Sequence, residues 1–191
     1  MHARPSLVGP TKLSNRDCAV AFTVIKGTLT VVASIYCDIN LKIPQVGLVE
    51  LLDFIKNNNY PLILGMDSNA HSTLYGLETN KRGEDLEDII FQYNLEVVNV
   101  LGTCTFEAYR GDTRIATCID VTLTCNLTQP VKRWRTDSNF NGSDHRTILF
   151  EMEQSPPEVK MVRNYKKRQT GTYLASFART AFFFFWCSSA P

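Results

Sequence analysis

One apolar segment that ends abruptly in polar residues constrains this chain most strongly. After Pro61 comes the run Leu-Ile-Leu-Gly-Met (62–66), which is followed by Asp67, Ser68, Asn69, Ala70 and His71. Such a run predicts a buried strand, and the glycine at position 65 allows the backbone to turn sharply where the polar cluster begins. Because side chains alternate along a strand, Asp67 and Asn69 can project to the same side of the sheet edge and share one metal ion or phosphate. A simple Asx-type turn explains the same residues, and this stretch alone leaves both interpretations open.

The apolar periodicity of the rest of the chain predicts a mixture of helices and strands. Two β-branched runs, 19–25 and 29–36, are separated by Lys26-Gly27-Thr28, which is typical of a hairpin. Helical spacing follows over 45–59 and, after a polar loop at 72–83, again over 84–93. Strand-like segments then occupy residues 95–100, 103–107, 115–124, 131–137 and 146–152. This order favours an α/β layered sandwich, with sheets packed on each other and helices outside, over a doubly wound parallel sheet.

Length and charge limit the classes of protein to consider. A chain of 191 residues can bury a core of its own, so one compact domain is expected. The net charge is +1, but residues 152–191 carry six Lys and Arg residues against two Glu, so this tail is at +4 and the remainder at −3. The body therefore lacks the net basic field that drives non-specific nucleic-acid binding, and any such contact has to be local.

The cysteines and the first residues bear on the compartment. The six cysteines form no Cys-x-x-Cys pair and no regular Cys/His spacing, so free buried thiols are expected rather than a zinc site. The first twenty residues lack the apolar core of a signal peptide, which favours the nucleus or cytoplasm over secretion. No segment approaches the roughly 18 apolar residues that a membrane span requires.

Two polar groups in the second half of the chain suggest a shared site. Asp120 is expected in the middle of an apolar strand, where an unpaired charge is costly, and His145 is an imidazole that such a carboxylate can orient. Taken singly, Asp120 can cap a backbone turn and His145 can be a satisfied core histidine. All five candidate residues lie where an apolar strand meets a polar turn, and together they favour a common site; they are Asp67, Asn69, Asp120, Asp144 and His145.

The order of these motifs resembles a known superfamily. Residues 65–71, the pair Ile119-Asp120 and residues 142–145 are similar to the ordered motifs of the endonuclease/exonuclease/phosphatase superfamily. Finer details resemble the endonuclease domain of non-LTR retrotransposons; these are Asn69-Ala70-His71, the segment 79–83 before a helix, Cys104-Thr105-Phe106 and residues 141–145. The resemblance implies a DNase I-like α/β/β/α sandwich over 19–153. It leaves 1–18 as a loose N-terminal segment and 154–191 as a linker and atypical aromatic tail, expected to be poorly ordered.

The resemblance also implies roles for individual residues. Asp67 would position or deprotonate the attacking water, and Asn69 would bind the phosphate. His145, held by Asp120, would stabilise charge on the phosphate. Tyr36 would contact the phosphate; a role as a core aromatic is the alternative.

A divalent cation is part of the same implied chemistry. Asp144, Asp67 and Asn69 are the expected ligands for Mg²⁺ or Mn²⁺, which would supply positive charge to the phosphate oxygens.

The chain departs from the family pattern at its beginning. Family members start with a strand that ends in asparagine and carry a metal-binding glutamate in a Gln-Glu motif, whereas residues 1–18 contain Asn15 but no glutamate. We therefore expect an N-terminally truncated domain with reduced metal affinity and weak or absent nuclease activity. The leading hypothesis is a DNA endonuclease of a retrotransposon, with a reverse transcriptase domain downstream in the intact element. The alternatives are a catalytically dead fragment that at most binds nucleic acid or protein, and a phosphatase of the same superfamily.

Two further segments allow more than one interpretation. Lys132, Arg133 and Arg135 flank Trp134 in one strand-like segment, which either approaches a DNA groove or forms a solvated edge protected by charge. The aromatic run at 182–186 fits neither strand alternation nor a helix face. We expect it to be unrelated to the domain; a partner-binding or membrane-surface anchor is the alternative.

Overall fold

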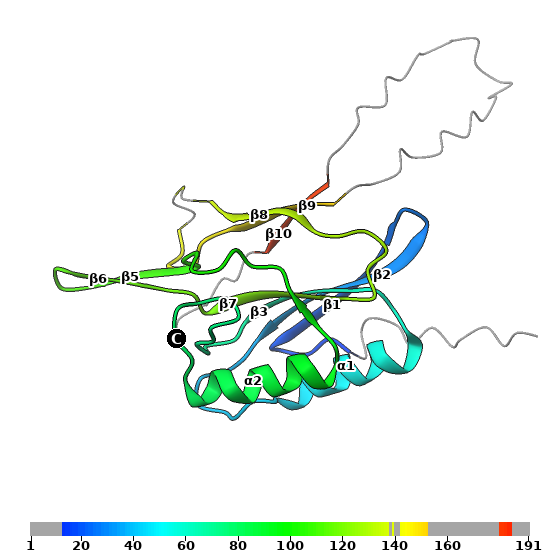
Figure 1. Cartoon of the computed structure of the whole chain (residues 1–191), viewed down its shortest axis with the longest axis horizontal. Coiled ribbons are helices and arrows are strands. Elements are labelled where there is room, and N and C mark those ends of the chain that lie inside the picture. Colours follow the sequence, from blue (N-terminus) through cyan, green and yellow to red (C-terminus); the bar gives the residue numbers. More distant parts are fainter. Residues whose placement is uncertain (1–12, 138, 140–141, 153–179, 185–191) are drawn as a thin grey trace, which may run out of the picture.

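The computed structural model describes residues 13–137, 139, 142–152 and 180–184 (Figure 1). Its central layer is a mixed five-stranded sheet with the order β1-β2-β3-β7-β4. Strand β2 pairs with β1 and, in parallel, with β3, which in turn lies antiparallel to β7. The strands are β1 (Cys18–Ile25), β2 (Thr28–Tyr36), β3 (Leu62–Asp67), β7 (Asp120–Cys125) and β4 (Glu96–Val97).

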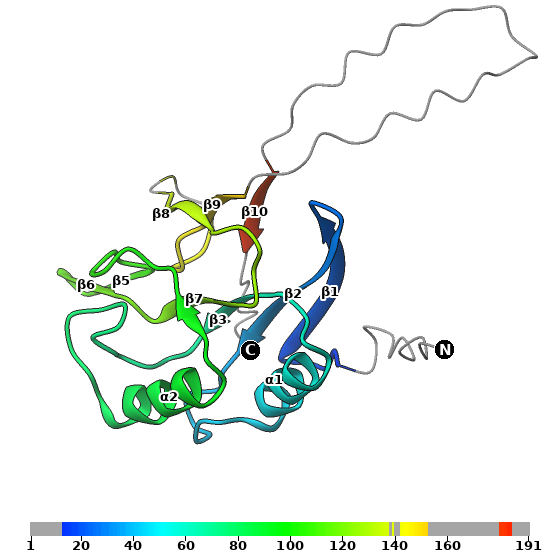
Figure 2. The same cartoon turned by 45° about the vertical axis from the view of Figure 1, so that its right-hand side comes forward.

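Two helices, α1 (Val46–Asn58) and α2 (Lys81–Gln92), cover one face of this sheet (Figures 1 and 2). Both follow the predicted periodicity, and their apolar sides pack on alternate residues of β3, among them Leu62, Leu64 and Met66. The α1 residues that form this core are Leu48, Leu51, Leu52 and Ile55. The intervening residues of β3 point to the opposite face of the sheet, as strand alternation requires.

A second, three-stranded sheet covers that opposite face (Figure 1). It consists of β8 (Lys132–Thr136), β9 (Ile148–Met152) and β10 (Thr180–Phe184), in the order β10-β9-β8. Ile63 of the central sheet shares a core with Trp134 and Phe150, and the Trp134 indole N–H donates to Thr122 Oγ1 at 2.9 Å. The α/β layered fold is thus confirmed, and the described residues form three of its four expected layers.

The segment between β4 and β7 differs from the sequence prediction. Strands β5 (Phe106–Arg110) and β6 (Thr113–Thr117) form a hairpin that extends beyond the layered body (Figure 1). The single strand predicted over 115–124 is therefore two strands, β6 and β7, and Asp120 is the first residue of β7 rather than a mid-strand residue. The physical reason is that Thr105 Oγ1 accepts the backbone N–H groups of Ile119 and Asp120, at 3.1 and 3.0 Å.

The C-terminal aromatic run also differs from its prediction. Thr180–Phe184 forms β10, which pairs antiparallel with β9 along its length. Main-chain hydrogen bonds to a neighbouring strand do not depend on side-chain alternation, and aromatic residues suit strands. The rest of the predicted tail, 153–179 and 185–191, and most of the predicted loose N-terminal segment, 1–12, lie outside the described residues.

The near end of the N-terminal segment is described. Leu13 packs against the helix-side core, and β1 begins at Cys18. Among the residues that the structure describes, no helix has the length and hydropathy needed to cross a membrane.

Candidate active site

Three strands of the central sheet present polar residues in one row at the same edge. Tyr36, the last residue of β2, is in register with Asp67, the last residue of β3, and Asp67 is in register with Asp120 of β7. Because Met66 packs toward the helices, Asp67 turns to the face that meets the second sheet. The row therefore lies at the rim between the two sheets.

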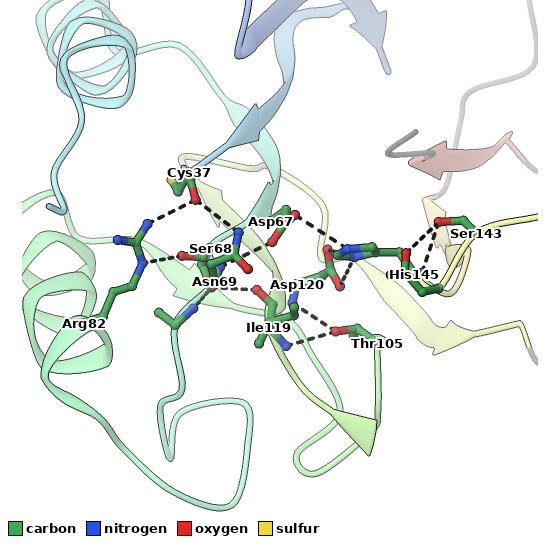
Figure 3. Close-up of polar contacts among 12 residues, drawn as sticks. Cys37, Asp67, Ser68, Asn69, Arg82, Thr105, Ile119, Asp120, Ser143 and His145 are labelled. Carbon is green, nitrogen blue, oxygen red and sulfur yellow. Dashed lines mark hydrogen bonds and ion pairs between the residues drawn. The ribbon is translucent and has the colours of Figure 1, made fainter. Parts of the chain in front are cut away.

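The His145 ring completes this rim from the segment that precedes β9 (Figure 3). Its Nδ1 lies 3.0 and 3.1 Å from the two carboxylate oxygens of Asp120, and its Nε2 lies 3.7 Å from Asp67 Oδ2. The ring also makes an edge-to-face contact with Phe106, with centroids 5.1 Å apart. The side chains of His145, Asp67 and Asp120 are 11%, 4% and 9% exposed, so the three groups interact with little solvent screening.

Burial and neighbouring charges shift the titration of this cluster. Burial, followed by the negative charge of Asp120, raises the pKa of Asp67 to about 7, although His145, the Asn69 N–H and Arg82 act in the opposite direction. Burial lowers the pKa of His145, but its hydrogen bond to Asp120 and the charges of Asp120, Asp67 and Asp144 outweigh burial, so that this pKa is raised. Asp67 can therefore exchange a proton near neutral pH, and the surrounding carboxylates favour the protonated form of His145.

Asn69 shows that the two interpretations of the Asp67 segment are compatible. Its backbone has φ +48°, a left-handed conformation that asparagine tolerates, and its N–H donates to Asp67 Oδ1 at 3.3 Å. This is the Asx-type turn, and it holds Asn69 directly beside the Asp67 carboxylate. The Asn69 side-chain Nδ2 donates to the Cys37 carbonyl at 3.2 Å.

The two remaining predicted site residues lie next to the cluster. Tyr36 is half-buried, and burial, followed by the charges of Asp38, Asp67 and Asp17, raises its pKa. Asp144 is exposed and sits outside the group of ligand atoms from Asp67, Asp120 and His145 that lie within 4.8 Å of one another. Asp67, Asn69, Asp120 and His145 thus lie close together, as predicted. The roles of these four residues, and those of Tyr36 and Asp144, stay predictions.

The comparison with protein families decides what kind of domain this is. The family model described as endonuclease-reverse transcriptase matches residues 30–149. The chain belongs to this family. No curated protein matches the chain by sequence.

One solved structure agrees with the endonuclease-reverse transcriptase assignment. The endonuclease domain of TRAS1, a telomere-specific non-LTR retrotransposon, is 26% identical with a TM-score of 0.64 over 74% of this chain and 65% of that one. This chain therefore spans slightly less than two thirds of the TRAS1 domain. A mannosyl-6-phosphatase of Bacteroides thetaiotaomicron (16% identity, TM-score 0.45, 71% and 56% coverage) also matches. An endonuclease/exonuclease/phosphatase family protein of that organism matches as well, with 16% identity and a TM-score of 0.44 over 70% of this chain and 54% of that one.

Sequence reasoning did not single out Thr105, which supports the site of this endonuclease-reverse transcriptase family member. Thr105 is fully buried, and besides capping Ile119 and Asp120 it accepts the Arg146 N–H at 2.7 Å through its carbonyl. Glu107 N–H donates to the Asp144 carbonyl at 2.7 Å, so the base of the hairpin holds both ends of the His145 segment. The Cys-Thr-Phe triplet was the available signal, but its partners are backbone groups that a sequence does not display.

One arginine of β8 and one of the hairpin each pair with a glutamate. Arg133 pairs with Glu151 at 3.1 Å, and Arg114 pairs with Glu107 at 2.6 Å. Glu107 also binds Arg146, and these two arginines lower the pKa of Glu107 to about 2. Strand β8 lies at the edge of its sheet, which agrees with a charged, solvated edge.

Proposed function

We propose that this domain cleaves phosphodiester bonds in DNA with the help of a divalent cation, at the rim formed by Asp67, Asp120 and His145. One observation carries the proposal: a single imidazole ring lies between two buried carboxylates, 3.0 Å from Asp120 and 3.7 Å from Asp67. A purely structural histidine needs one partner, whereas two carboxylates that repel each other around one ring are costly without a chemical use. The family match supports DNA as the substrate class.

Each residue has a role that follows from its surroundings. Without a bound cation the pKa of Asp67 is about 7, so this carboxyl group is suited to position the attacking water and to take a proton from it at neutral pH. Asp120 fixes the His145 ring through Nδ1, and the raised pKa of His145 favours a protonated ring that stabilises negative charge on the phosphate. Tyr36 and Asn69, which flank Asp67, would bind phosphate oxygens through their hydroxyl and amide groups.

The donor atoms at the rim fit a divalent cation, but weakly. Asp67 is a buried carboxylate whose charge is opposed by Asp120, and a cation would relieve that repulsion. We assign Asp67, Asn69 and Asp144 as ligands of Mg²⁺ or Mn²⁺, because Asp120 is already bonded to His145. A bound cation would neutralise charge on the non-bridging oxygens. With Asp67 as the one buried carboxylate in this set, we expect low metal affinity and slow cleavage.

Plasmid nicking tests the proposal. Wild-type protein should nick supercoiled DNA slowly in Mg²⁺ or Mn²⁺ and not in EDTA. The His145→Ala and His145→Gln variants should lose roughly 100-fold or more of that rate, because neither stabilises charge on the phosphate. Thermal melting of each variant identifies loss of folding.

The matched control is Asp88→Asn, an exposed carboxylate on α2, which should nick like wild type. Salt-sensitive DNA binding without metal-dependent nicking would instead identify a binding fragment. Phosphate release from a small phosphomonoester without nicking would identify a phosphatase.

We also expect a reverse transcriptase domain downstream in the intact element, acting in the nucleus or cytoplasm.

A further inference from the structure

Arg82 lies at a helix end that disfavours a cation. It is the second residue of α2, where the helix dipole presents its positive end. The neighbouring Lys81 makes surface ion pairs with Glu84 at 3.2 Å and Asp85 at 2.9 Å. The half-buried Arg82 side chain instead reaches toward the strand ends that carry the candidate site (Figure 3). Its position is therefore explained by its contacts and not by helix electrostatics.

The Arg82 guanidinium binds main-chain carbonyls from two separate loops. Nε donates to the Ser68 carbonyl at 2.9 Å, directly after β3. Nη2 donates to the Cys37 and Asp38 carbonyls at 3.1 and 3.0 Å, and Nη1 donates to the Leu41 carbonyl, all in the loop after β2. A planar fork of N–H donors can bridge these carbonyls, whereas the compact ammonium of lysine cannot span them.

The Cys37 backbone connects this fork to the candidate site. Its N–H donates to the Asp67 carbonyl at 2.8 Å, and its carbonyl accepts both Arg82 Nη2 and Asn69 Nδ2, the latter at 3.2 Å. Cys37 is fully buried, so this carbonyl has little access to water as a substitute partner. The orientation of the Asn69 amide therefore depends on a carbonyl that Arg82 holds in place.

We infer that Arg82 is a positioning residue for Asn69, in the segment directly after β3. Its fork fixes the Cys37 carbonyl, and this carbonyl orients the Asn69 side chain beside Asp67. That the oriented amide serves phosphate binding rests on the function proposed above, whereas the orientation itself does not. Arg82 acts on the reaction through Asn69 and does not contact the substrate.

The test compares Arg82→Met and Arg82→Lys with the matched control Lys81→Met in the full chain. The Asn69 side-chain amide resonance, assigned by its loss in Asn69→Ala, should shift in both Arg82 variants and not in Lys81→Met. Both Arg82 variants should lower kcat for plasmid nicking by roughly 10-fold to 100-fold with little change in KM. Asn69→Ala should cost little more in the Arg82→Met background, because both changes break the same contact.

The outcomes separate this inference from the proposed function. An unshifted Asn69 resonance in folded Arg82→Met, additive effects of the two substitutions, or full recovery by Arg82→Lys would overturn the positioning role. Absence of nicking by the wild type would overturn the proposed function, and the amide resonance would still judge the role of Arg82. Melting curves identify any variant that does not fold. If Arg82→Met does not fold, the Asn69 resonance and the nicking rate of Arg82→Lys are compared with those of the wild type instead.

Discussion

The Asp67 carboxyl group is 4% exposed and lies in register with a second carboxylate, Asp120. Its pKa of about 7, raised from 3.8, means that the folded chain prefers the neutral acid. The stabilising effect of this shift is fully present below pH 3.8 and is lost as the pH rises through about 7. At the pH where Asp67 can act as a base, it therefore destabilises the fold.

Asp67→Asn should make the folded chain more stable while removing activity. The amide keeps the shape of the side chain without its charge, so unfolding free energy should rise by on the order of 2 kcal/mol at pH 8 and much less at pH 5. Urea unfolding in EDTA at the two pH values measures this difference. Asp112→Asn, at the exposed hairpin turn, should change stability by less than about 0.5 kcal/mol. A variant less stable than wild type at pH 8 would contradict the assigned pKa.

At this scale the sequence is informative about side chains that do chemistry and silent about those that support them. Asp67, Asp120 and His145 stand out because a polar residue beside an apolar run needs an explanation. Arg82 and Thr105 do not stand out, because an arginine near the start of a helix and a threonine in a strand are common in proteins without any functional role. Their partners here are mainly backbone groups, which every residue possesses.

At the scale of elements, the backbone at the N-terminus of α2 lies directly against the segment after β3. Asn80 caps the helix by accepting the Gly83 N–H at 2.8 Å, and its own N–H donates to the His71 carbonyl at 3.1 Å. A Cβ on Gly83 would lie 1.6 Å from the His71 carbonyl oxygen, which is a backbone atom. This approach lets Arg82, one residue earlier, reach the strand ends.

Gly83→Ala should therefore lower the free energy of unfolding by about 3 kcal/mol or more, because helix and loop must separate to admit a methyl group. Gly47→Ala is the matched control, since it also lies in a helix but its Cβ would meet the movable end of the Asn15 side chain. That change should stay within about 1 kcal/mol, helped by the better helix propensity of alanine. Equal losses in both variants, measured by urea unfolding, would show that the approach to His71 is not limiting.

Element boundaries were predictable where the signal is local. The cores of both helices and β3 follow from the apolar pattern within their own residues. The start of α2 does not, because residues 81–83, which the predicted loop includes, belong to the helix. The break between β6 and β7 does not, because it depends on hydrogen bonds from Thr105 to residues fourteen and fifteen positions later. Likewise β10 pairs with a strand far away in the sequence, and no periodicity within 180–184 shows it.

At the scale of the whole molecule, the site depends on how the two sheets are stacked. Asp67 and Asp120 belong to the central sheet, whereas His145 enters from the segment that leads into β9. The core between the sheets includes Phe150 of β9, which is fully buried. The distance between His145 and the carboxylates is therefore set by packing remote from the rim.

Phe150→Ala should destabilise the domain by about 3–5 kcal/mol, as expected for a large cavity in a core. Nicking should fall as well, because the sheets can shift against each other. Phe91→Ala, which removes a ring that is 70% exposed, should change unfolding by less than about 0.5 kcal/mol. Urea denaturation measures both, and a Phe150→Ala variant as stable as Phe91→Ala would show that the second sheet does not hold the site together.

The buried thiol of Cys37 can report local opening of the loops around it. Burial raises the pKa of that thiol to about 12, and the side chain is 0% exposed, so an alkylating reagent at neutral pH meets neither a thiolate nor an open path. Modification of Cys37 must then wait for the surrounding loops to part. The rate at which the Cys37 peptide is alkylated, followed by mass spectrometry, therefore measures how often the loops around the Asp67 rim open.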